Sequence, residues 1–571
     1  MSNIIKKSYL RLLPVQIFGL LVAAINTMID SVITGRYIGT EALAAIGFFV
    51  PVATVIGISY VLTTGIQIMC GRAIGSGDKK KVSSLFTTGV VILGVFALSV
   101  SLLCIVFCRP LAAFLGAKGE TLTLTASYIS GYSYGIVGQV LSGILMFFLP
   151  LNNGEKRSYI AIALMVITNV ALDIIFVPVL NMGLWGMGLA TSISYLVSAG
   201  YMLFSFFNRK RTVYLDIKNL DFSILPEAAL TGMPSLMFTV GCTAKAFIMN
   251  RFMMNVIGTE AVAVINVQNS VCSFAGTIPL GCAAAFMTLG SISYGEEDRK
   301  GYVDTFRYAM KVGCILSAAL MLLIMMFSNV LPALFFSSGD PAWVIAQRML
   351  MIFPSFLVFN TVLNLFLKCY HIQDKKGFVN VMTVAENLII GLYSAVGVSL
   401  IGADAVWLAF PLAELSLLLV IAVIRLRKKS WMWLQKTFGA SEDEKIECCV
   451  QNMEDVINLS VKIIDFCDER GIRHHDSKIA GLCIEEMASN IVTYGFSDQK
   501  PHKIDIRTVI KNSELIIRIR DDCKAFDPLE RMDQFSPVDP CKNIGIRMIG
   551  KLTKDVSYYN IVGINNLLMK V

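Results

Sequence analysis

Runs of about twenty apolar residues recur along this chain from its N-terminus to about residue 426, and they constrain the fold more than any other feature. A run of this length can cross the hydrocarbon core of a bilayer as one α-helix. The composition agrees, since 55% of the 571 residues are apolar and only 16% are charged. Most of the chain is therefore predicted to lie in a membrane, which excludes a fully soluble, disordered, collagen-like or disulfide-rich secreted protein.

The apolar runs place twelve spans, at about residues 11–35, 42–70, 85–108, 123–149, 158–180, 186–207, 228–256, 261–289, 303–327, 345–369, 378–400 and 404–426. Alternate loops, counted from the N-terminus, hold 22 Lys and Arg residues, whereas the other loops hold 5. Because basic loops remain in the cytoplasm, both chain termini are predicted to be cytoplasmic. The net charge of +8 is attributed to these loops, so no nucleic acid is expected as a partner.

The chain contains an internal duplication. Ile38–Ala42, with the sequence Ile-Gly-Thr-Glu-Ala, recurs as Ile257–Ala261 at an offset of 219 residues, and other positions repeat at the same offset. Each copy holds six spans, and an even number gives both copies the same orientation in the bilayer. The predicted fold is an all-α membrane protein of two six-helix lobes, residues 1–219 and 220–429, which enclose a cavity as in transporters that alternate access.

Ionisable side chains inside spans are costly to bury, so they are candidates for function. The first lobe offers Asp30 and Asp173, and Asn169 lies one helical turn before Asp173 on the same face. A carboxylate in such a place can take up a proton, or it can bind Na⁺ together with an amide oxygen. The candidates in the second lobe are Lys245, Glu386, Asn387 and Glu414. The structural alternatives are that Asp30 caps a helix end and that Lys245 permanently neutralises a carboxylate.

Several of these residues carry a resemblance to a known family. Met28–Gly35 and Ile38–Gly47 resemble the start of the multidrug and toxic compound extrusion (MATE) family. Asn169–Asp173, followed by Gly183–Thr191, resembles its fifth and sixth spans. The resemblance covers about residues 8–430. It implies a bacterial inner (plasma) membrane antiporter that exports small organic cations or amphipathic compounds in exchange for H⁺ or Na⁺.

By the same resemblance, Asp30, Asn169 and Asp173 form the coupling site. Related families flip lipid-linked sugars, so a lipid-linked substrate flippase is an alternative. That alternative predicts a basic cavity, and the spans hold few basic residues. The chain has no Gly-x-x-x-x-Gly-Lys-Ser/Thr motif, so an ATP-driven pump of the ABC type is not expected.

The C-terminal part has a different composition. About 29% of residues 446–571 are charged, against about 12% of the rest, so this part is predicted to be a soluble cytoplasmic domain. Residues 430–445 are interpreted as an aromatic interfacial anchor and a linker. The domain shows helical patterns at 450–470, 476–493 and 544–553 and strand patterns at 503–509, 514–520, 555–560 and 566–571. It is predicted to be an α/β sandwich with one core.

Polar motifs of this domain suit a nucleotide. Glu486 and Asn490 share a helix face, and an amide oxygen beside a carboxylate suits Mg²⁺ bound to phosphates. Asp521 ends a strand, where its carboxylate can accept a hydrogen bond from an amino group such as that of adenine. Asn543 and Gly545 open a helix whose N-terminus can face a phosphate. The further candidate positions are Asp527, Gly563 and Asn565.

The order of these motifs resembles the GHKL-type ATP-binding domain, in the branch of anti-sigma-factor serine kinases. The resemblance implies ATP and Mg²⁺ as cofactors, with Asn490 as the metal ligand, Glu486 as the catalytic base and Asp521 as the carboxylate that binds adenine. A tail of this kind is expected to regulate transport or a cytoplasmic protein partner. The alternative is a membrane-tethered serine kinase or partner-switch protein whose spans sense a ligand.

The tail departs from its family pattern at three glycine positions. Cys523 and Ala525 replace two glycines of one motif, and Asn543 replaces the first glycine of the last. Glycine permits close approach of the backbone and positive φ. We therefore expect Cys523 to crowd the nucleotide or to strain the turn, whereas Asn543 is the milder change because Asn tolerates left-handed φ.

Overall fold

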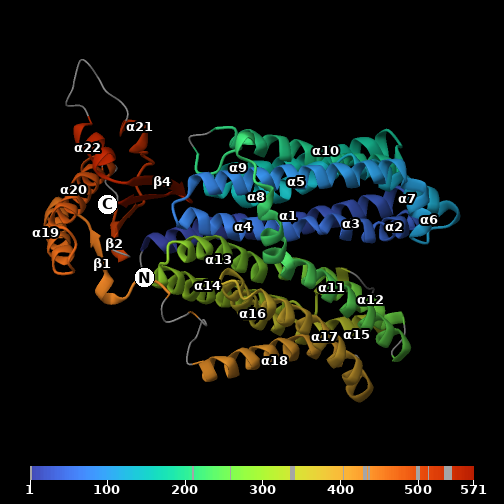
Figure 1. The fold of residues 1–571 in the computed structure, drawn as a ribbon. Helices are drawn as coiled ribbons and strands as arrows, with labels where there is room; N and C mark the ends of the chain where they lie inside the picture. Colours follow the sequence, from blue (N-terminus) through green and yellow to red (C-terminus); the bar gives the residue numbers. More distant parts are fainter. Residues whose placement is uncertain are drawn as a thin grey trace.

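The structure, a computed structural model, describes residues 3–208, 211–256, 259–334, 341–402, 404–428, 434, 438–496, 502–511, 514–532 and 543–571. Two parts are visible, a long helical body and a smaller α/β domain at one end of it (Figure 1). We call the end of the body that carries the α/β domain the tail side, and the opposite end the far side.

The body consists of two lobes that follow one another along the chain. The first lobe contains α1 (Asn3–Tyr37), α2 (Thr40–Gly47), α3 (Val50–Gly57), α4 (Ser59–Gly75), α5 (Lys79–Val106), α6 (Cys108–Phe114), α7 (Gly119–Ser133), α8 (Ile136–Phe148), α9 (Glu155–Ile174) and α10 (Gly183–Leu203). The second lobe contains α11 (Leu225–Val256), α12 (Thr259–Ala275), α13 (Thr277–Gly295), α14 (Arg299–Met326), α15 (Pro341–Ile352), α16 (Phe356–Ile372), α17 (Lys376–Ile401) and α18 (Asp404–Lys428).

Within the described residues, ten helical segments are long and apolar enough to cross a membrane, or eleven if the bent pair α7 and α8 is one span. The 32-residue helix α11 is not among them, but it lies at the seventh predicted place. Helical segments therefore occupy all twelve predicted places. The 50° bend between α7 and α8 falls at Gly135, where a Cβ would lie 2.2 Å from the Cα of Ser192 on α10.

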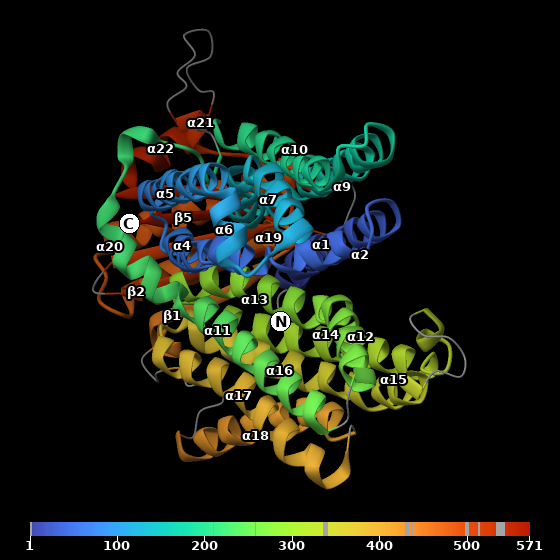
Figure 2. The same cartoon turned by 90° about the vertical axis from the view of Figure 1, so that its right-hand side faces the viewer.

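The two lobes lie side by side, approach each other closely on the tail side and diverge toward the far side (Figures 1 and 2). Glycines permit the close approach of α4 to the second lobe. A Cβ on Gly75 would lie 2.2 Å from the carbonyl oxygen of Ile292 on α13, and a Cβ on Gly232 of α11 would lie 1.6 Å from that of Val61. The helices are therefore in backbone contact along this side, as small residues allow between helices in membranes.

The C-terminal domain has the α/β sandwich fold that the sequence predicts. Its elements are β1 (Lys445–Val450), α19 (Met453–Asp468), α20 (His474–Asn490), β2 (Ile504–Lys511), β3 (Glu514–Asp521), α21 (Leu529–Met532), α22 (Ile544–Leu552), β4 (Asp555–Ile561) and β5 (Ile564–Lys570). The strands form one antiparallel sheet in the order β1-β2-β3-β5-β4. The sequence reading missed β1 and started the first helix too early, because β1 is defined by pairing with β2, more than fifty residues away.

The two faces of the sheet differ in chemistry. Ile506, Ile519 and Leu567 stand in register on one face and belong to a buried apolar cluster shared with α19, α20 and α22. The other face carries Arg507 and Arg518, which are also in register. This alternation is the period-2 pattern of a strand with one apolar face. The polar face is nevertheless buried, because it lies against the helical body.

The contact of α4 with α11 gives a test of the fold. We expect Gly232→Ala to lower the thermal stability of the detergent-solubilised protein, by about 1–3 kcal/mol, because its Cβ would overlap the backbone of α4. Gly94→Ala on α5 is the matched control, since no atom lies within 4 Å of its added Cβ. Thermal unfolding followed by tryptophan fluorescence measures both, and equal midpoints would contradict this packing.

Candidate functional site

The structure brings the two carboxylates of the first lobe together. Asp30 lies on α1 and Asp173 on α9, and their carboxyl groups are close enough to interact directly. Asp173 is completely buried. Apart from each other, both carboxyl oxygens of Asp173 and Oδ1 of Asp30 have no hydrogen-bond partner within the described part of the chain. Two ionised carboxylates in this position repel each other unless a proton or a cation lies between them, so this pair is a candidate site for either.

Amide side chains add oxygen atoms along the same helices. Asn169 is buried on α9, and its Nδ2 donates to Oγ1 of Thr191 on α10 at 3.4 Å. Its Oδ1 has no partner among the described residues. The sequence reading missed Asn26, which lies one turn before Asp30 on α1 and also has a buried Oδ1 without a described partner. The same i, i+4 spacing that singles out Asn169 would have found it.

Aromatic side chains lie around this pair. Tyr128 and Tyr132 on α7 both interact electrostatically with Asp30. The ring of Phe49 packs against both tyrosines. Its centroid lies 5.1 Å from that of Tyr128 and 4.6 Å from that of Tyr132. Aromatic rings beside a carboxylate provide both an apolar surface and an attractive face for an organic cation.

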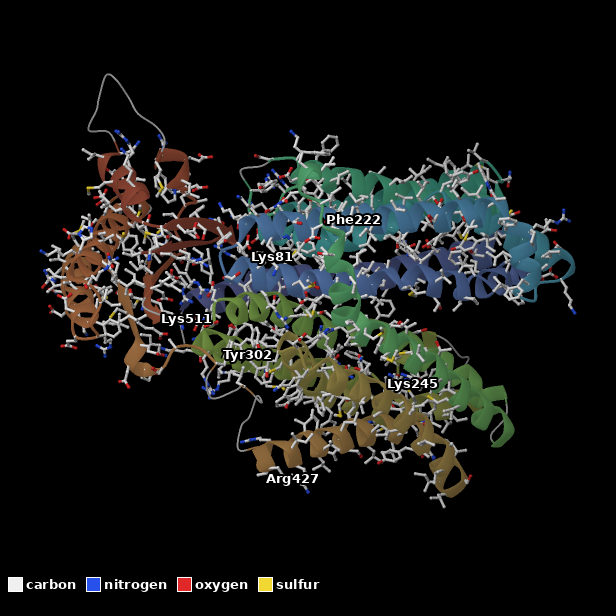
Figure 3. All side chains as sticks on the ribbon, viewed as in Figure 1. Lys81, Phe222, Lys245, Tyr302, Arg427 and Lys511 are labelled. Carbon is white, nitrogen blue, oxygen red and sulfur yellow. The ribbon has the colours of Figure 1, made fainter. Side chains whose placement is uncertain are left out.

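A second acidic cluster forms in the other lobe. Asn360 on α16 donates from Nδ2 to Glu414 on α18 at 2.6 Å and to Glu386 on α17 at 3.5 Å. The two glutamates interact with each other and with Lys245 on α11, which Figure 3 shows among the helices of the second lobe. Asn387 makes other contacts: its amide donates to the carbonyl oxygen of Thr383 within α17, and its Oδ1 accepts from the thiol of Cys242 on α11 at 3.5 Å. The structure thus groups three of the four predicted residues and adds Asn360, which the sequence reading missed.

The tail contains a cavity of about 820 Å³. Six predicted residues line it: Glu486, Asn490, Asp521, Asn543, Gly545 and Asn565. Two do not line it. Asp527 accepts from the amide of Leu529 at the start of α21, and Gly563 lies in the turn between β4 and β5, where its amide donates to Asn153 of the first lobe. Apolar and aromatic lining residues that the sequence reading did not name are Tyr494, Phe526 and Tyr558.

The predicted metal ligand and the predicted base contact each other. Nδ2 of Asn490 donates to Oε1 of Glu486 at 3.0 Å, which leaves the amide oxygen of Asn490 available to a hard cation. The Glu486 carboxyl lies against the first turn of α22, and a Cβ on Gly545 would lie 2.0 Å from its carboxyl carbon. A side chain at position 545 would displace the Glu486 carboxyl group from this place, so the N-terminus of α22 and the acidic side chain share one wall of the cavity.

Asp521 is held by a small network at the end of β3. Its Oδ1 accepts from Nδ2 of Asn565 at 2.6 Å and from the amide of Cys523 at 3.0 Å. Tyr558 donates to Oδ1 of Asn565 at 2.6 Å and so fixes the orientation of the amide. Burial raises the pKa of Asp521, and the hydrogen bonds from Asn565 and Cys523 oppose that rise. The carboxyl group is thus oriented to accept from a ligand in the cavity.

The replaced glycines have different consequences. Asn543 adopts a left-handed conformation with φ 56°, as expected of the residue type that tolerates it. Cys523 and Ala525 are not among the described residues with positive φ, so the expected strain at Cys523 is absent. Cys523 does line the cavity and packs on Gly495, where a Cβ would lie 3.0 Å from the Cys523 sulfur. The replacement narrows the cavity without distorting its backbone.

Comparison with known families divides the chain in the same way. The MatE family model matches residues 16–179 and 234–397, and the model of the histidine kinase-like ATPase domain matches residues 451–570. The two MatE segments are related by an offset of 218 residues, close to the 219 of the repeated motif. The predicted likeness to an extrusion family with an ATP-binding-type tail, and the fold class, are therefore confirmed.

Two curated bacterial proteins show how far the likeness extends. The probable multidrug resistance protein YoeA of Bacillus subtilis (strain 168) is 23% identical over 345 residues, which are 58% of this chain and 73% of YoeA. The multidrug export protein MepA of Staphylococcus aureus (strain NCTC 8325 / PS 47) is 26% identical over 295 residues, 51% of this chain and 64% of MepA. The match thus spans slightly less than two thirds of MepA.

Solved structures match the fold of the body. An outward-facing conformation of a multidrug resistance MATE family transporter of the MOP superfamily superposes with a TM-score of 0.70 at 22% identity, covering 74% of this chain and 96% of that chain. A MATE structure in complex with MaL6 gives 0.69 at the same identity and coverage.

The Asp521 network gives a test of the tail. We expect Asn565→Ala to destabilise the tail by about 1–3 kcal/mol, because a buried carboxyl group loses its side-chain donor. Asn458→Ala, on the exposed side of α19, is the control and should leave stability unchanged. Unfolding of the full chain by denaturant, monitored through hydrogen exchange of peptides from the tail, measures the stability of the tail in both variants. Equal exchange in both variants would show that Asn565 does not support Asp521.

Proposed function

Because this chain belongs to the MatE family, we propose that its helical body exports small organic cations or amphipathic compounds across a bacterial plasma membrane, coupled to the inward flow of H⁺ or Na⁺. The observation that carries the coupling is the pair of carboxyl groups at Asp30 and Asp173, which interact directly. No other described residue donates to either oxygen of Asp173 or to Oδ1 of Asp30. Both relatives described above are named for multidrug resistance or export. The excess of basic residues in alternate loops supports a cytoplasmic position of the tail and of both termini in this proposal.

A physical cycle follows from this pair. When an ion or a proton sits between Asp30 and Asp173, their repulsion falls and α1 can lie close to α9. When it leaves, the two carboxylates repel each other and attract a cationic substrate instead. Exchange of the ion for the substrate requires that only one of them occupies the carboxylate pair at a time. The rings of Phe49, Tyr128 and Tyr132 supply an apolar wall for the organic part of such a substrate.

The cavity of the tail fits ATP and Mg²⁺. The amide oxygen of Asn490 would hold the metal, the N-terminus of α22 would face the phosphates, and Asp521 would accept a hydrogen bond from the adenine amino group. ATP bound here would act as a regulator, since export in this proposal draws its energy from the ion gradient. Glu486 lies beside Asn490, in the place of a general base, and this contact is the observation that favours a kinase as the second candidate.

The coupling pair gives the first test of this function. We expect Asp173→Asn to reduce export of a fluorescent organic cation from proteoliposomes at least about 100-fold, because the neutral side chain can no longer exchange an ion for the substrate. Glu120→Gln in the first turn of α7 is the control, since this carboxylate is exposed. Asp30→Asn should behave like Asp173→Asn. Normal export by both variants would contradict the assignment of the pair.

Nucleotide binding is tested separately on the full chain in detergent by calorimetry. We expect Asn490→Ala to weaken binding of ATP with Mg²⁺ about tenfold or more, equivalent to about 1.4 kcal/mol. Cys523→Gly should strengthen it, because the cavity gains the space that the thiol occupies. Transfer of phosphate to a partner protein that is lost in Glu486→Gln would support the kinase instead, and absence of any binding would leave the tail as a docking domain.

A further inference from the structure

The polar face of the tail sheet lies across two turns of the body that the duplication relates to each other. The first-lobe turn, Ser76–Asp78, joins α4 to α5, and the acidic turn, Glu296–Asp298, joins α13 to α14. Each ends in an aspartate that caps the next helix, with nearly identical backbone angles at Asp78 and Asp298. The two turns occupy the same place in the two lobes, one on each side of the contact between α4 and α13.

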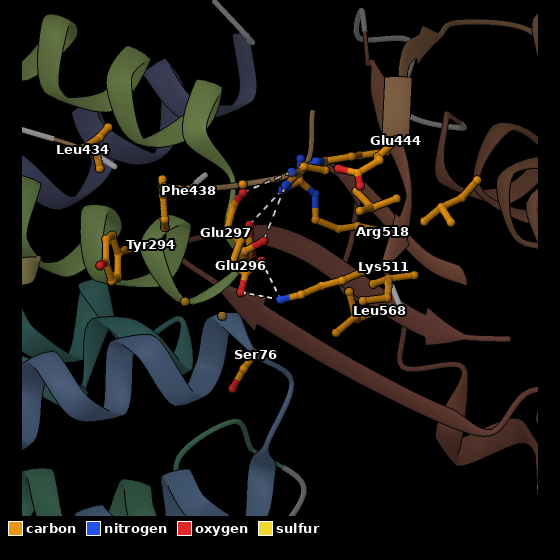
Figure 4. Close-up of a pocket in the computed structure, with 18 of the residues that line it drawn as sticks. Ser76, Tyr294, Glu296, Glu297, Leu434, Phe438, Glu444, Lys511, Arg518 and Leu568 are labelled. Carbon is orange, nitrogen blue, oxygen red and sulfur yellow. Dashed lines mark hydrogen bonds and ion pairs between the residues drawn. The ribbon is translucent and has the colours of Figure 1, made fainter. Parts of the chain in front are cut away.

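The acidic turn is bound by arginines of β3. Glu296 accepts a hydrogen bond from Arg518 at 2.8 Å (Figure 4). It accepts a second one from Arg520, and Asp298 accepts one from Arg518 at 2.7 Å. The side chains of Glu296 and Asp298 are only 3% and 5% exposed. At the edge of the cluster, Lys511 pairs with Glu297 at 2.6 Å. Bonds between ionised groups of this kind are among the strong hydrogen bonds of proteins.

The negative charges of the acidic turn are compensated by the neighbouring arginines. Burial alone would raise the pKa of the Asp298 carboxyl, but the guanidinium groups of Arg518, Arg507 and Arg520 hold that pKa well below its usual value. Arg507 also donates to the backbone carbonyl oxygen of Glu297 at 3.1 Å. Removing one partner of such a cluster leaves an uncompensated buried charge, which costs several kcal/mol.

The other half of the sheet contacts the first lobe. A Cβ on Gly77 would lie 2.8 Å from Leu568 of β5, and the ammonium of Lys79 lies 5.6 Å from the ring centroid of Tyr559 on β4. Directly after β3, Asp522 forms an ion pair with Lys7 at the start of α1, at 2.5 Å. These contacts bind β4, β5 and the end of β3 to the lobe that carries Asp30.

The turn between β4 and β5 inserts into the same lobe. Arg11 of α1 donates to the carbonyl oxygen of Val562 at 3.3 Å, and Asn153, before α9, accepts from the amide of Gly563 at 2.6 Å. Val562 is fully buried and has φ 51°, a left-handed conformation that is unfavourable for a β-branched side chain. The contact with the body is what holds this turn in place.

We propose that the ATPase-like domain is a clamp that holds the two lobes together on the tail side, and that the tail side opens only when the acidic turn leaves Arg518 and Arg520. This rests on the proposed function, in which the lobes must separate on that side during transport. Strands β3 and β5 are joined by a continuous ladder of paired residues, so a sheet bound to both turns cannot lengthen. The lobes can separate only if one set of contacts breaks.

The second-lobe contact is the one that releases. The contact of the sheet with the acidic turn consists of ion pairs and of hydrogen bonds such as that from Asn566 of β5 to Glu296 at 2.9 Å, beside a cavity of about 660 Å³. It is therefore polar and incompletely packed. Contacts of that character are typical of domains that move relative to each other. The first-lobe contact instead includes Val562, whose side chain belongs to the apolar core of the body and whose carbonyl oxygen accepts from Arg11 of α1. The clamp therefore stays on the first lobe and lets go of the second.

A native thiol reports the separation of the lobes. Cys282 on α13 is fully buried, and Tyr9 of α1 donates to its carbonyl oxygen across the lobe boundary at 3.2 Å. Cys369 on α16 is equally buried, but its partner Tyr302 lies on α14 of the same lobe. Alkylation by a water-soluble maleimide, read for each cysteine by peptide mass spectrometry, follows both thiols in the full chain. The assay requires neither export nor nucleotide, so it can fail or succeed independently of the proposed function.

We expect Glu296→Arg and Arg520→Glu each to raise the alkylation rate of Cys282 about tenfold or more while the rate of Cys369 stays unchanged. The double charge swap should bring the Cys282 rate below that of either single variant, because it restores one ion pair of opposite polarity, while Arg518 next to position 296 keeps the rate above that of the native protein. Arg473→Glu, which breaks an exposed ion pair at the start of α20, should change neither rate.

Three results would overturn the clamp. These are an unchanged Cys282 rate in both single variants, a rise at Cys369 that matches the rise at Cys282, and a double swap that remains as reactive as the single variants. The first would show that the contact does not hold the lobes, the second that the variants only loosen the fold, and the third that the ion pair is not the link.

Discussion

A bilayer offers no hydrogen bonds, so each polar group inside it must be satisfied by the protein itself. This constraint fixes the helical body, because a helix satisfies its own backbone. It also explains why glycines concentrate where α4 meets the second lobe, since helices in lipid gain attraction only from close packing. The pair Asp30 and Asp173 departs from this rule, because most of its carboxyl oxygens have no donor among the described residues. Since such burial is costly, the pair marks a place where an ion, a proton or a ligand binds.

The parts that could be predicted are those with a local signature. Apolar runs located the twelve places of the spans, and i, i+4 spacing located Asn169 beside Asp173. Motif order located the residues that line the tail cavity. Each of these rests on neighbours along the chain, where helix geometry alone decides which side chains share a face.

The parts that could not be predicted depend on partners far apart in sequence. Arg518 and Arg520 have no local signature of their role, because nothing near them in the chain shows that another part of the protein covers them. Their partner Glu296 precedes them by more than 200 residues. Asn360 was missed for the same reason, since its role is defined by two other helices. Gly563 fits the motif but serves the contact with the body, because the turn that carries it is bound by the first lobe.

Two of the buried acidic side chains, Asp298 and Asp173, suit two different tasks. Asp298 has arginine partners, and a guanidinium does not lose its charge at any physiological pH. Its state therefore changes only when the whole domain moves. Asp173 has no such partner among the described residues, so its state can change whenever a proton or an ion arrives. A compensated cluster can hold two lobes together, and an uncompensated pair can respond to an ion. The end of β3 connects the cavity of the tail with the helix that carries Asp30, because Asp521 lines that cavity and its neighbour Asp522 pairs with Lys7 on α1.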